Sequence, residues 1–99
     1  ENKADICASV QDRIVSILMN KLKKAAQQTG IRQIAIAGGV SANSALRNSL
    51  QQAGEELSWH TYIPKFEYCT DNAAMIAVSG YFRYQKGLFS QQDVRPFAR

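Results

Sequence analysis

Apolar residues recur at every third or fourth position through the first part of the chain, which places them on one face of a helix. This spacing predicts a helix from Lys3 to Thr29, with Gly30 as its C-terminal cap. Asp5 lies in the expected first turn, where a carboxylate suits the helix dipole. The apolar stripe expected to be buried consists of Ile6, Val10, Ile14, Ile17 or Leu18, Leu22 and Ala25.

Two strands and two further helices are expected after this helix. The predicted elements are, in order, a strand over residues 31–37, a helix over 41–53, a strand over 59–63, a loop over 65–70 and a helix over 71–85. The run from Ile34 to Ala37 is continuously apolar, which is typical of a strand covered on both faces. Gly54 and Gly87 are expected to stop the two helices, and Pro64 to end the second strand. Short strand–helix–strand connections predict a parallel pair with a right-handed crossover.

Both later helices carry a packing pattern. The helix over 41–53 is expected to bury Ala42, Leu46, Leu50 and Ala53. The helix over 71–85 carries small residues that allow a close approach to a neighbour, namely Ala73, Ala74, Ala77 and Gly80.

Composition places the chain among globular proteins. Of its 99 residues 45% are hydrophobic, which argues against disorder. Its net charge of +4 suits a nucleic-acid partner or simple solubility equally well. No apolar run has the length of a transmembrane helix. Cys7 and Cys69 stand in no metal-binding spacing, so both are expected to be reduced and mostly buried in a cytoplasmic protein. A long helix that begins almost at once, without an initiator methionine, indicates a piece of a larger protein.

The candidate chemistry lies where the two strands end. Ligands of parallel sheets gather outside the carboxyl ends of the strands, and Gly38, Gly39, Asn43 and Asp71 all follow such ends. Two adjacent glycines offer backbone N–H groups with no side chain in the way, and a helix N-terminus beside them would favour a phosphate. The Asn43 amide can hydrogen-bond a ligand, and the Asp71 carboxylate can bind a metal ion.

Each of these residues also has a structural interpretation. A Gly-Gly turn between strand and helix is often only a turn, and here no lysine follows to complete a P-loop. Asn43 could cap a helix, and Asp71 sits at or close to the cap position of the last one. His60 alternates with aromatic residues along a strand, which is typical of a packed or surface residue. Ser41 and Ser44 have no histidine at a plausible spacing to activate them, so no nucleophilic site is evident.

Two motifs together resemble a known family. They are Ile36-Ala37-Gly38-Gly39-Val40-Ser41-Ala42-Asn43 followed by Leu46-Arg47, and Tyr68-Cys69-Thr70-Asp71-Asn72-Ala73-Ala74-Met75-Ile76-Ala77. In this order they closely resemble the C-terminal part of the TsaD family, the bacterial counterpart of the universal threonylcarbamoyl transferases, long catalogued as O-sialoglycoprotein endopeptidases. The similarity covers essentially the whole chain and about the last third of the family protein.

The resemblance implies a fold, a reaction and roles for the candidate residues. The family belongs to the actin-like ATPase (ribonuclease H-like) superfamily, in which nucleotide lies between two α/β lobes. Residues 1–99 would be a segment of the C-terminal lobe, in helix–strand–helix–strand–helix order with parallel strands. Gly38 and Gly39 would touch the phosphates of ATP or threonylcarbamoyl-AMP, Asn43 would contact the substrate, and Asp71 would ligate a divalent iron or zinc ion. The implied reaction moves the threonylcarbamoyl group from threonylcarbamoyl-AMP to the adenosine beside the tRNA anticodon.

The chain departs from the family pattern in the residues that would bind the metal ion. The family's site also needs two histidines in H-x-x-x-H spacing from its N-terminal lobe, and His60 stands alone here. We therefore expect the chain to contribute half a site, to hold no catalytic residue of its own and to be inactive alone. The implied partners are the N-terminal lobe of the same protein, a paralogous actin-like subunit and tRNA, in the cytoplasm and with no membrane.

Two other functions stay open on these residues. A non-catalytic actin-like scaffold that pairs with the transferase would share the fold but would not need the Asp71 carboxylate. A sugar or carboxylate kinase of the superfamily would share the glycine turn but not the run Thr70-Asp71-Asn72-Ala73-Ala74. The peptidase name finds no support, because the chain has neither an H-E-x-x-H helix nor a catalytic triad.

Overall fold

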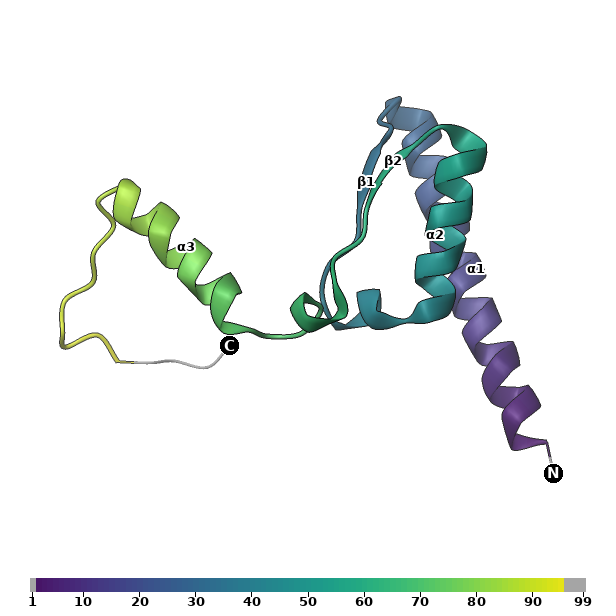
Figure 1. Ribbon diagram of the computed structural model, residues 1–99, viewed down its shortest axis with the longest axis horizontal. Helices are drawn as coiled ribbons and strands as arrows, with labels where there is room; N and C mark the ends of the chain where they lie inside the picture. The colour runs from purple at the N-terminus through teal and green to yellow at the C-terminus, as the bar shows by residue number, and fades with distance from the viewer. Residues whose placement is uncertain (1, 96–99) are drawn as a thin grey trace.

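The computed structural model describes residues 2–95 of the chain (Figure 1). Its elements are α1 (Lys3–Thr29), β1 (Gln33–Ala35), the short 3-10 helix η1 (Gly39–Ala42), α2 (Ser44–Leu57), β2 (His60–Tyr62), the short 3-10 helix η2 (Phe66–Tyr68) and α3 (Ala73–Gln85). The predicted mixed α/β order of helix, strand, helix, strand and helix is confirmed. It is consistent with part of an actin-like lobe.

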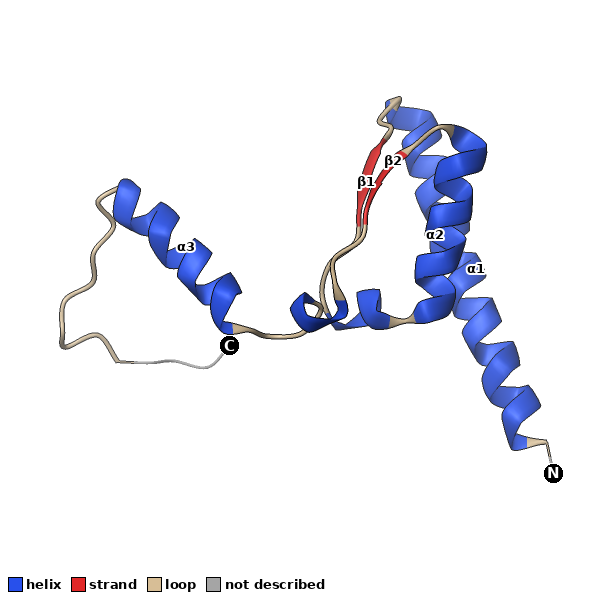
Figure 2. Ribbon diagram, in the orientation of Figure 1, coloured by secondary structure: helices blue, strands red, loops and turns tan. Residues whose placement is uncertain are grey.

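The two strands form a parallel pair, as the short connection through α2 predicts. Gln33 lies opposite His60, Ile34 opposite Thr61 and Ala35 opposite Tyr62. Figure 2 shows both strands running beside α2, with α1 against the same helix. The carboxyl ends of β1 and β2 therefore lie at one edge of the sheet, and the two loops that leave them start side by side.

The core lies between one face of this sheet and the two helices. Its buried members are Val15, Met19, Ala26, Ile34, Leu46, Leu50 and Ala53. The second helix buries the expected residues Leu46, Leu50 and Ala53. The sheet differs from the prediction, because Ile34 is buried whereas its neighbours in β1 are exposed, so the described residues cover only one face.

The buried face of α1 is not the one that the sequence pattern indicated. Val15, Met19 and Ala26 are buried, whereas the expected stripe is half exposed from Ile6 to Leu18. The two stripes differ by one position along the chain, which is a rotation of about 100° around the helix. Because α1 is apolar on both stripes, its own periodicity could not decide which of them meets α2.

Of the glycines Gly30 and Gly54, both predicted to end a helix, only Gly30 does so. α1 ends at the expected residue, since Gly30 takes the left-handed conformation and its N–H donates to the Ala26 carbonyl at 2.9 Å. Gly54 does not stop α2, which continues to Leu57 and has Ser58 as its left-handed cap. Gly54 is buried within the helix, where it serves close packing.

The third helix stands apart from the other elements in Figure 1. It begins at Ala73, runs to Gln85 as expected and buries none of its residues in the described part of the chain. Its small residues therefore have no neighbour there to approach. Within residues 2–95 no helix is both long and apolar enough to cross a membrane.

The two cysteines differ in environment. Cys69 is buried as expected, but Cys7 is exposed on α1, so that prediction was wrong for one of the pair. Cys7 lies in the N-terminal part of α1, about two turns before Val15, the first buried residue of that helix.

Candidate functional site

The glycine turn after β1 has a backbone that only glycine adopts easily. Gly38 has φ 80° and ψ 177°, a region closed to residues with a Cβ. The turn is tied down by Ser41, whose N–H and hydroxyl both donate to the Gly38 carbonyl, at 3.0 and 2.6 Å. Ser41 is only 1% exposed, so the residue that holds the turn is itself fixed by its buried position.

The N–H groups of this turn remain available for a ligand. Neither Gly38 nor Gly39 donates a hydrogen bond to another residue of the described chain. A Cβ built on either glycine would meet nothing within 4 Å, so open space lies beside the backbone. The turn can therefore present two backbone donors to an acceptor group that comes close.

The helix after the turn begins later than predicted. The short helix η1 follows Gly38, and α2 starts at Ser44 rather than at Ser41. Asn43 caps α2, because its Oδ1 accepts from the Leu46 N–H at 2.9 Å. The Asn43 side chain therefore satisfies one N–H group at the start of α2, and the approach of a phosphate to this helix end stays a prediction.

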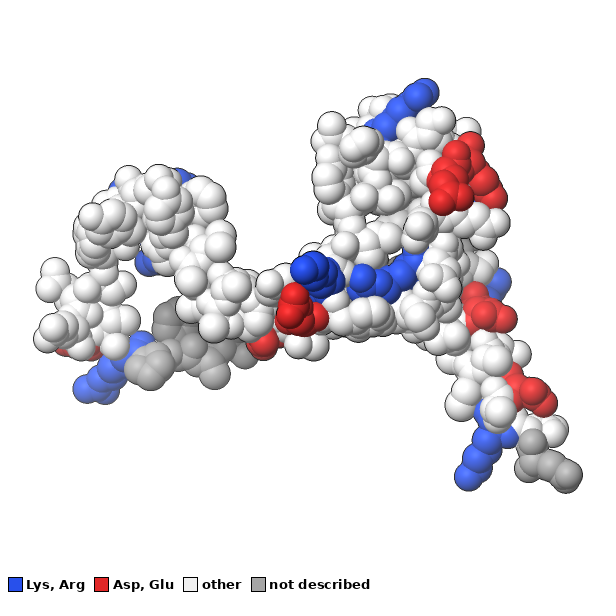
Figure 3. Space-filling view, in the orientation of Figure 1, with Lys and Arg blue, Asp and Glu red and all other residues white. Residues whose placement is uncertain are grey.

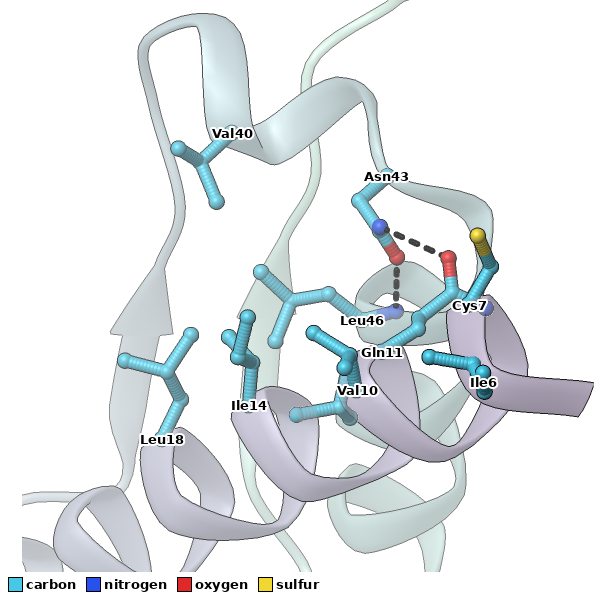
Figure 4. Close-up of a pocket in the computed structure, with 10 residues that line it drawn as sticks. Ile6, Cys7, Val10, Gln11, Ile14, Leu18, Val40, Asn43 and Leu46 are labelled. Carbon is cyan, nitrogen blue, oxygen red and sulfur yellow. Dashed lines mark hydrogen bonds between the residues drawn. The ribbon is translucent and has the colours of Figure 1, made fainter. Parts of the chain in front are cut away.

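Asn43 uses both ends of its amide within the chain. Besides capping α2, its Nδ2 donates to Gln11 Oε1 of α1 at 3.1 Å (Figure 4). The structural interpretation of Asn43 is thus confirmed. An amide has two lone pairs and two N–H donors, so one of each remains for a further contact.

Asp71 lies one residue before the cap of α3. Asn72 is that cap, since its Oδ1 accepts from the Met75 N–H at 2.9 Å and its Nδ2 donates to the Thr70 carbonyl. The helix-cap interpretation of Asp71 is therefore wrong, although the residue is close to the cap, as expected. Asp71 is exposed, and its carboxylate makes no hydrogen bond or ion pair within residues 2–95.

Arg47 belongs to the first sequence motif, but the sequence assigned it no role. It lies in the first turns of α2 and donates from Nη1 to the Ser41 carbonyl at 2.9 Å and to Cys69 Sγ at 3.4 Å. Its Nη2 donates to the Pro64 carbonyl. The guanidinium also stacks on Phe66, with its carbon 4.2 Å from the ring centroid. In the sequence, an arginine that makes these contacts looks no different from one that is solvated on the surface of a helix. Only the fold therefore reveals the contacts of Arg47.

The structure thus assembles part of the expected site. Gly38, Gly39 and Asn43 share one connection after β1, and Arg47 joins that connection to the loop after β2. Asp71 lies further along that second loop, at the start of α3, and its meeting with the glycine turn stays a prediction. His60 is exposed, and its ring lies near that of Tyr62, as expected of a surface residue.

A groove opens on the far side of the Asn43 cap, between α1 and η1 (Figure 4). It has a volume of about 350 Å³. Its lining is mostly apolar and consists of Ile6, Cys7, Val10, Gln11, Ile14, Val15, Leu18, Val40, Asn43 and Leu46. None of these ten lining residues is charged.

On the face shown in Figure 3, charged side chains do not gather into a binding surface. In Figure 3 basic and acidic side chains stand in small separate groups, and no broad basic surface appears on the face shown. Among residues 2–95 no three His, Cys, Asp or Glu side chains gather in a way that could hold a metal ion. The chemistry visible in this chain is therefore that of the glycine turn and its supports.

Comparison with known proteins gives one consistent result. Residues 1–78 match the sequence profile described as TsaD, tRNA N6-adenosine threonylcarbamoyltransferase. Proteins with that name from Cytophaga hutchinsonii, Riemerella anatipestifer and Porphyromonas gingivalis are 54%, 56% and 50% identical to the chain over all 99 residues. The chain spans 29% of the length of each of these relatives.

Proposed function

The chain belongs to the TsaD family, and from that membership we propose that it is the C-terminal segment of a tRNA N6-adenosine threonylcarbamoyltransferase. The whole enzyme would move the threonylcarbamoyl group from threonylcarbamoyl-AMP to the adenosine beside the tRNA anticodon. The observation that carries this proposal is the identity of at least 50% over all 99 residues with three proteins of that name. The fold and the glycine turn support it.

The proposed role of the glycine turn is to hold the phosphate of the nucleotide. Within residues 2–95 the N–H groups of Gly38 and Gly39 donate to no other residue and have open space beside them, which suits the close approach of an anion. Threonylcarbamoyl-AMP releases AMP when the acyl group leaves, so charge on its phosphate rises along the reaction. Fixed backbone donors aimed at that phosphate would stabilise the leaving group without reorganisation.

Asn43 is proposed to contact the substrate beside this turn. Its support is the spare lone pair and N–H of an amide whose position is fixed from two sides, by Leu46 of α2 and Gln11 of α1. A side chain held in this way loses little conformational freedom when a ligand binds.

Asp71 is proposed as one ligand of a divalent iron or zinc ion. Its free, exposed carboxylate supports the proposal. The described residues do not fit a complete site, because no second and third ligand gather with it, and protein metal sites use at least three. The other ligands would have to come from outside this chain, so we assign no step of the reaction to the ion here.

The remaining partners are proposed from the family resemblance and from the share of its relatives that the chain spans. It spans 29% of its relatives, so the rest of the site is proposed to come from the N-terminal lobe of the same protein. The tRNA substrate and a paralogous actin-like subunit complete the proposed set, and the cytoplasm is the proposed compartment. The chain alone is proposed to be inactive.

The sharpest test of this function is Gly39→Ala in the intact transferase. The added Cβ meets nothing within 4 Å, and Gly39 has no positive φ, so the fold should be unchanged. A methyl group facing the phosphate should reduce tRNA modification by about tenfold or more, because one misplaced contact at the reacting group can cost about 100-fold.

The control is the stability of the Gly39→Ala enzyme itself, whose thermal unfolding midpoint should equal that of the unaltered enzyme, because the added Cβ meets nothing within 4 Å in the described chain. An equal midpoint would show that the loss of activity does not come from misfolding. If Gly39→Ala modifies tRNA at the unaltered rate, the glycine turn does not hold the nucleotide.

A further inference from the structure

One side chain joins the two loops that leave the carboxyl ends of the strands. In the described part of the chain, the only hydrogen bonds between residues 38–43 and residues 64–72 run through the guanidinium of Arg47. The sheet itself pairs only as far as the bond from the Ile36 N–H to the Tyr62 carbonyl, at 3.1 Å. Beyond that point no hydrogen bond other than those of Arg47 joins the two loops within residues 2–95.

The contacts of Arg47 are suited to holding a geometry. Its guanidinium is planar, with donors in a fixed fork, and three acceptors from two loops share that fork. Two of the contacted residues are nearly inaccessible, since Ser41 is 1% and Cys69 is 2% exposed. Water therefore competes weakly for these bonds, and hydrogen bonds in such surroundings are stronger than those at the surface.

The two loops carry the residues that the proposed function needs. Ser41, whose carbonyl Arg47 contacts, holds the Gly38 carbonyl and so fixes the glycine turn. Cys69, which Arg47 also contacts, precedes Asp71 by two residues. The Cys69 thiol in turn donates to the Lys65 carbonyl at 3.4 Å, which closes η2 on itself. A movement of the guanidinium would therefore release both loops.

We propose that Arg47 is a positioning residue, which sets the distance between the glycine turn and the loop that carries Asp71. This inference rests on the proposed function, because it assumes that both loops serve one reaction. Arg47 has no need to touch the substrate in this role. A positive charge alone is not enough for this role. A lysine at this position would keep the charge, but its ammonium group cannot reach all three acceptors or stack flat on Phe66.

The test uses Arg47→Lys and Arg47→Ala in the intact transferase, with Arg32→Lys as the matched control. Arg32 is exposed just before β1, at the other end of the strands, and its side chain makes no hydrogen bond within residues 2–95. Both Arg47 variants should lower kcat by about 10- to 100-fold, as expected for misplaced reacting groups, with the KM for tRNA changed by less than about threefold. Arg32→Lys should keep both constants.

A second measurement reports on the loops without any catalysis. Alkylation of Cys69, followed by peptide mass mapping, should become about tenfold faster or more in both Arg47 variants, because opening of the loop exposes a buried thiol. The unaltered protein and Arg32→Lys should protect Cys69 equally well. A purely structural role would lower the yield of folded protein but leave kcat of the folded fraction unchanged.

The possible results test the positioning role of Arg47 separately from the proposed transferase function. A kcat for Arg47→Lys within about threefold of the unaltered value, or unchanged alkylation of Cys69, overturns the positioning role. If neither Arg47 variant folds, Phe66→Leu decides, since it removes the stacking partner from an exposed position. Faster Cys69 alkylation in that variant supports the role, and an unchanged rate overturns it. Full activity of Gly39→Ala and Asp71→Asn would instead overturn the proposed function.

Discussion

Glycines illustrate how far a single residue can be interpreted from sequence. Gly30 and Gly54 both follow an apolar stripe, and both were predicted to end a helix. Only Gly30 does so, because Gly54 is needed where α2 crosses β2. A Cβ on Gly54 would lie 2.7 Å from the Cγ2 methyl of Thr61. That neighbour is seven positions away and becomes a contact only through the fold, so no local pattern could reveal it.

Gly54→Ala should therefore destabilise the chain, although alanine is the better helix former. Thr61 is β-branched and stiff, so the clash should lower the free energy of unfolding by about 1–3 kcal/mol, as in other overpacked cores. Chemical denaturation monitored by circular dichroism measures this change. In a Thr61→Ser background the methyl group is gone, and the same substitution should be neutral or stabilising by up to about 1 kcal/mol. An equal loss in both backgrounds would contradict the clash.

Two adjacent capping residues show a second limit at this scale. Asp71 and Asn72 both favour the cap position, and propensity does not rank them. The fold selects Asn72, which leaves the Asp71 carboxylate without a partner in the described chain. The sequence therefore identified the right segment but not the residue that caps it. This distinction matters for function, because a carboxylate engaged in capping would be less available to a metal ion.

At the scale of elements, the order and the parallel pairing followed from the sequence, and the packing face of α1 did not. The helix boundaries at Lys3 and Thr29 were predicted correctly, since caps and periodicity are local signals. Both sides of α1 are apolar enough to be buried, so the choice depends on what packs against it. The sequence motifs likewise located the glycine turn and included Arg47, but they did not predict its contacts, because its partners come from two loops.

The face that packs can be tested by a pair of substitutions in α1. Met19 is 7% exposed and Ile14 is 53% exposed. Met19→Ala should lower the free energy of unfolding of the 99-residue chain by about 2 kcal/mol or more, because it leaves a cavity in the core. Ile14→Ala should cost less than about 1 kcal/mol, because little is buried there and alanine favours the helix. A larger loss for Ile14→Ala would show that α1 packs through the stripe expected from sequence.

The cap of α2 can be separated from its link to α1. Asn43→Ala loses both contacts and should lower the free energy of unfolding by about 1 kcal/mol. Asn43→Asp still accepts from the Leu46 N–H and caps a helix as well as asparagine does, so it should cost less than about 0.5 kcal/mol. Denaturant unfolding of the two variants measures the difference. Equal losses would mean that the contact with Gln11, rather than the cap, carries the stability.

The whole molecule has more apolar surface than its core can use. One face of the sheet is uncovered by described residues, α3 buries nothing, and the N-terminal half of α1 exposes its apolar stripe. The chain spans 29% of its relatives, so the surfaces that would cover these faces are not among its own described residues. This explains why the sequence predicted a strand covered on both faces: the pattern of Ile34 to Ala37 matches a more complete sheet than these residues build.

The exposed stripe on α1 should make the isolated 99-residue chain associate with itself. Large contiguous apolar surfaces on soluble chains are rare because they bury themselves in contacts. Sedimentation velocity should therefore show species larger than a monomer that increase with protein concentration. Val10→Lys places a charge in the apolar groove and should shift the chain toward the monomer. Gln28→Lys adds the same charge on α1 outside that groove and should not. If both variants shift the equilibrium equally, net charge rather than the apolar groove controls association.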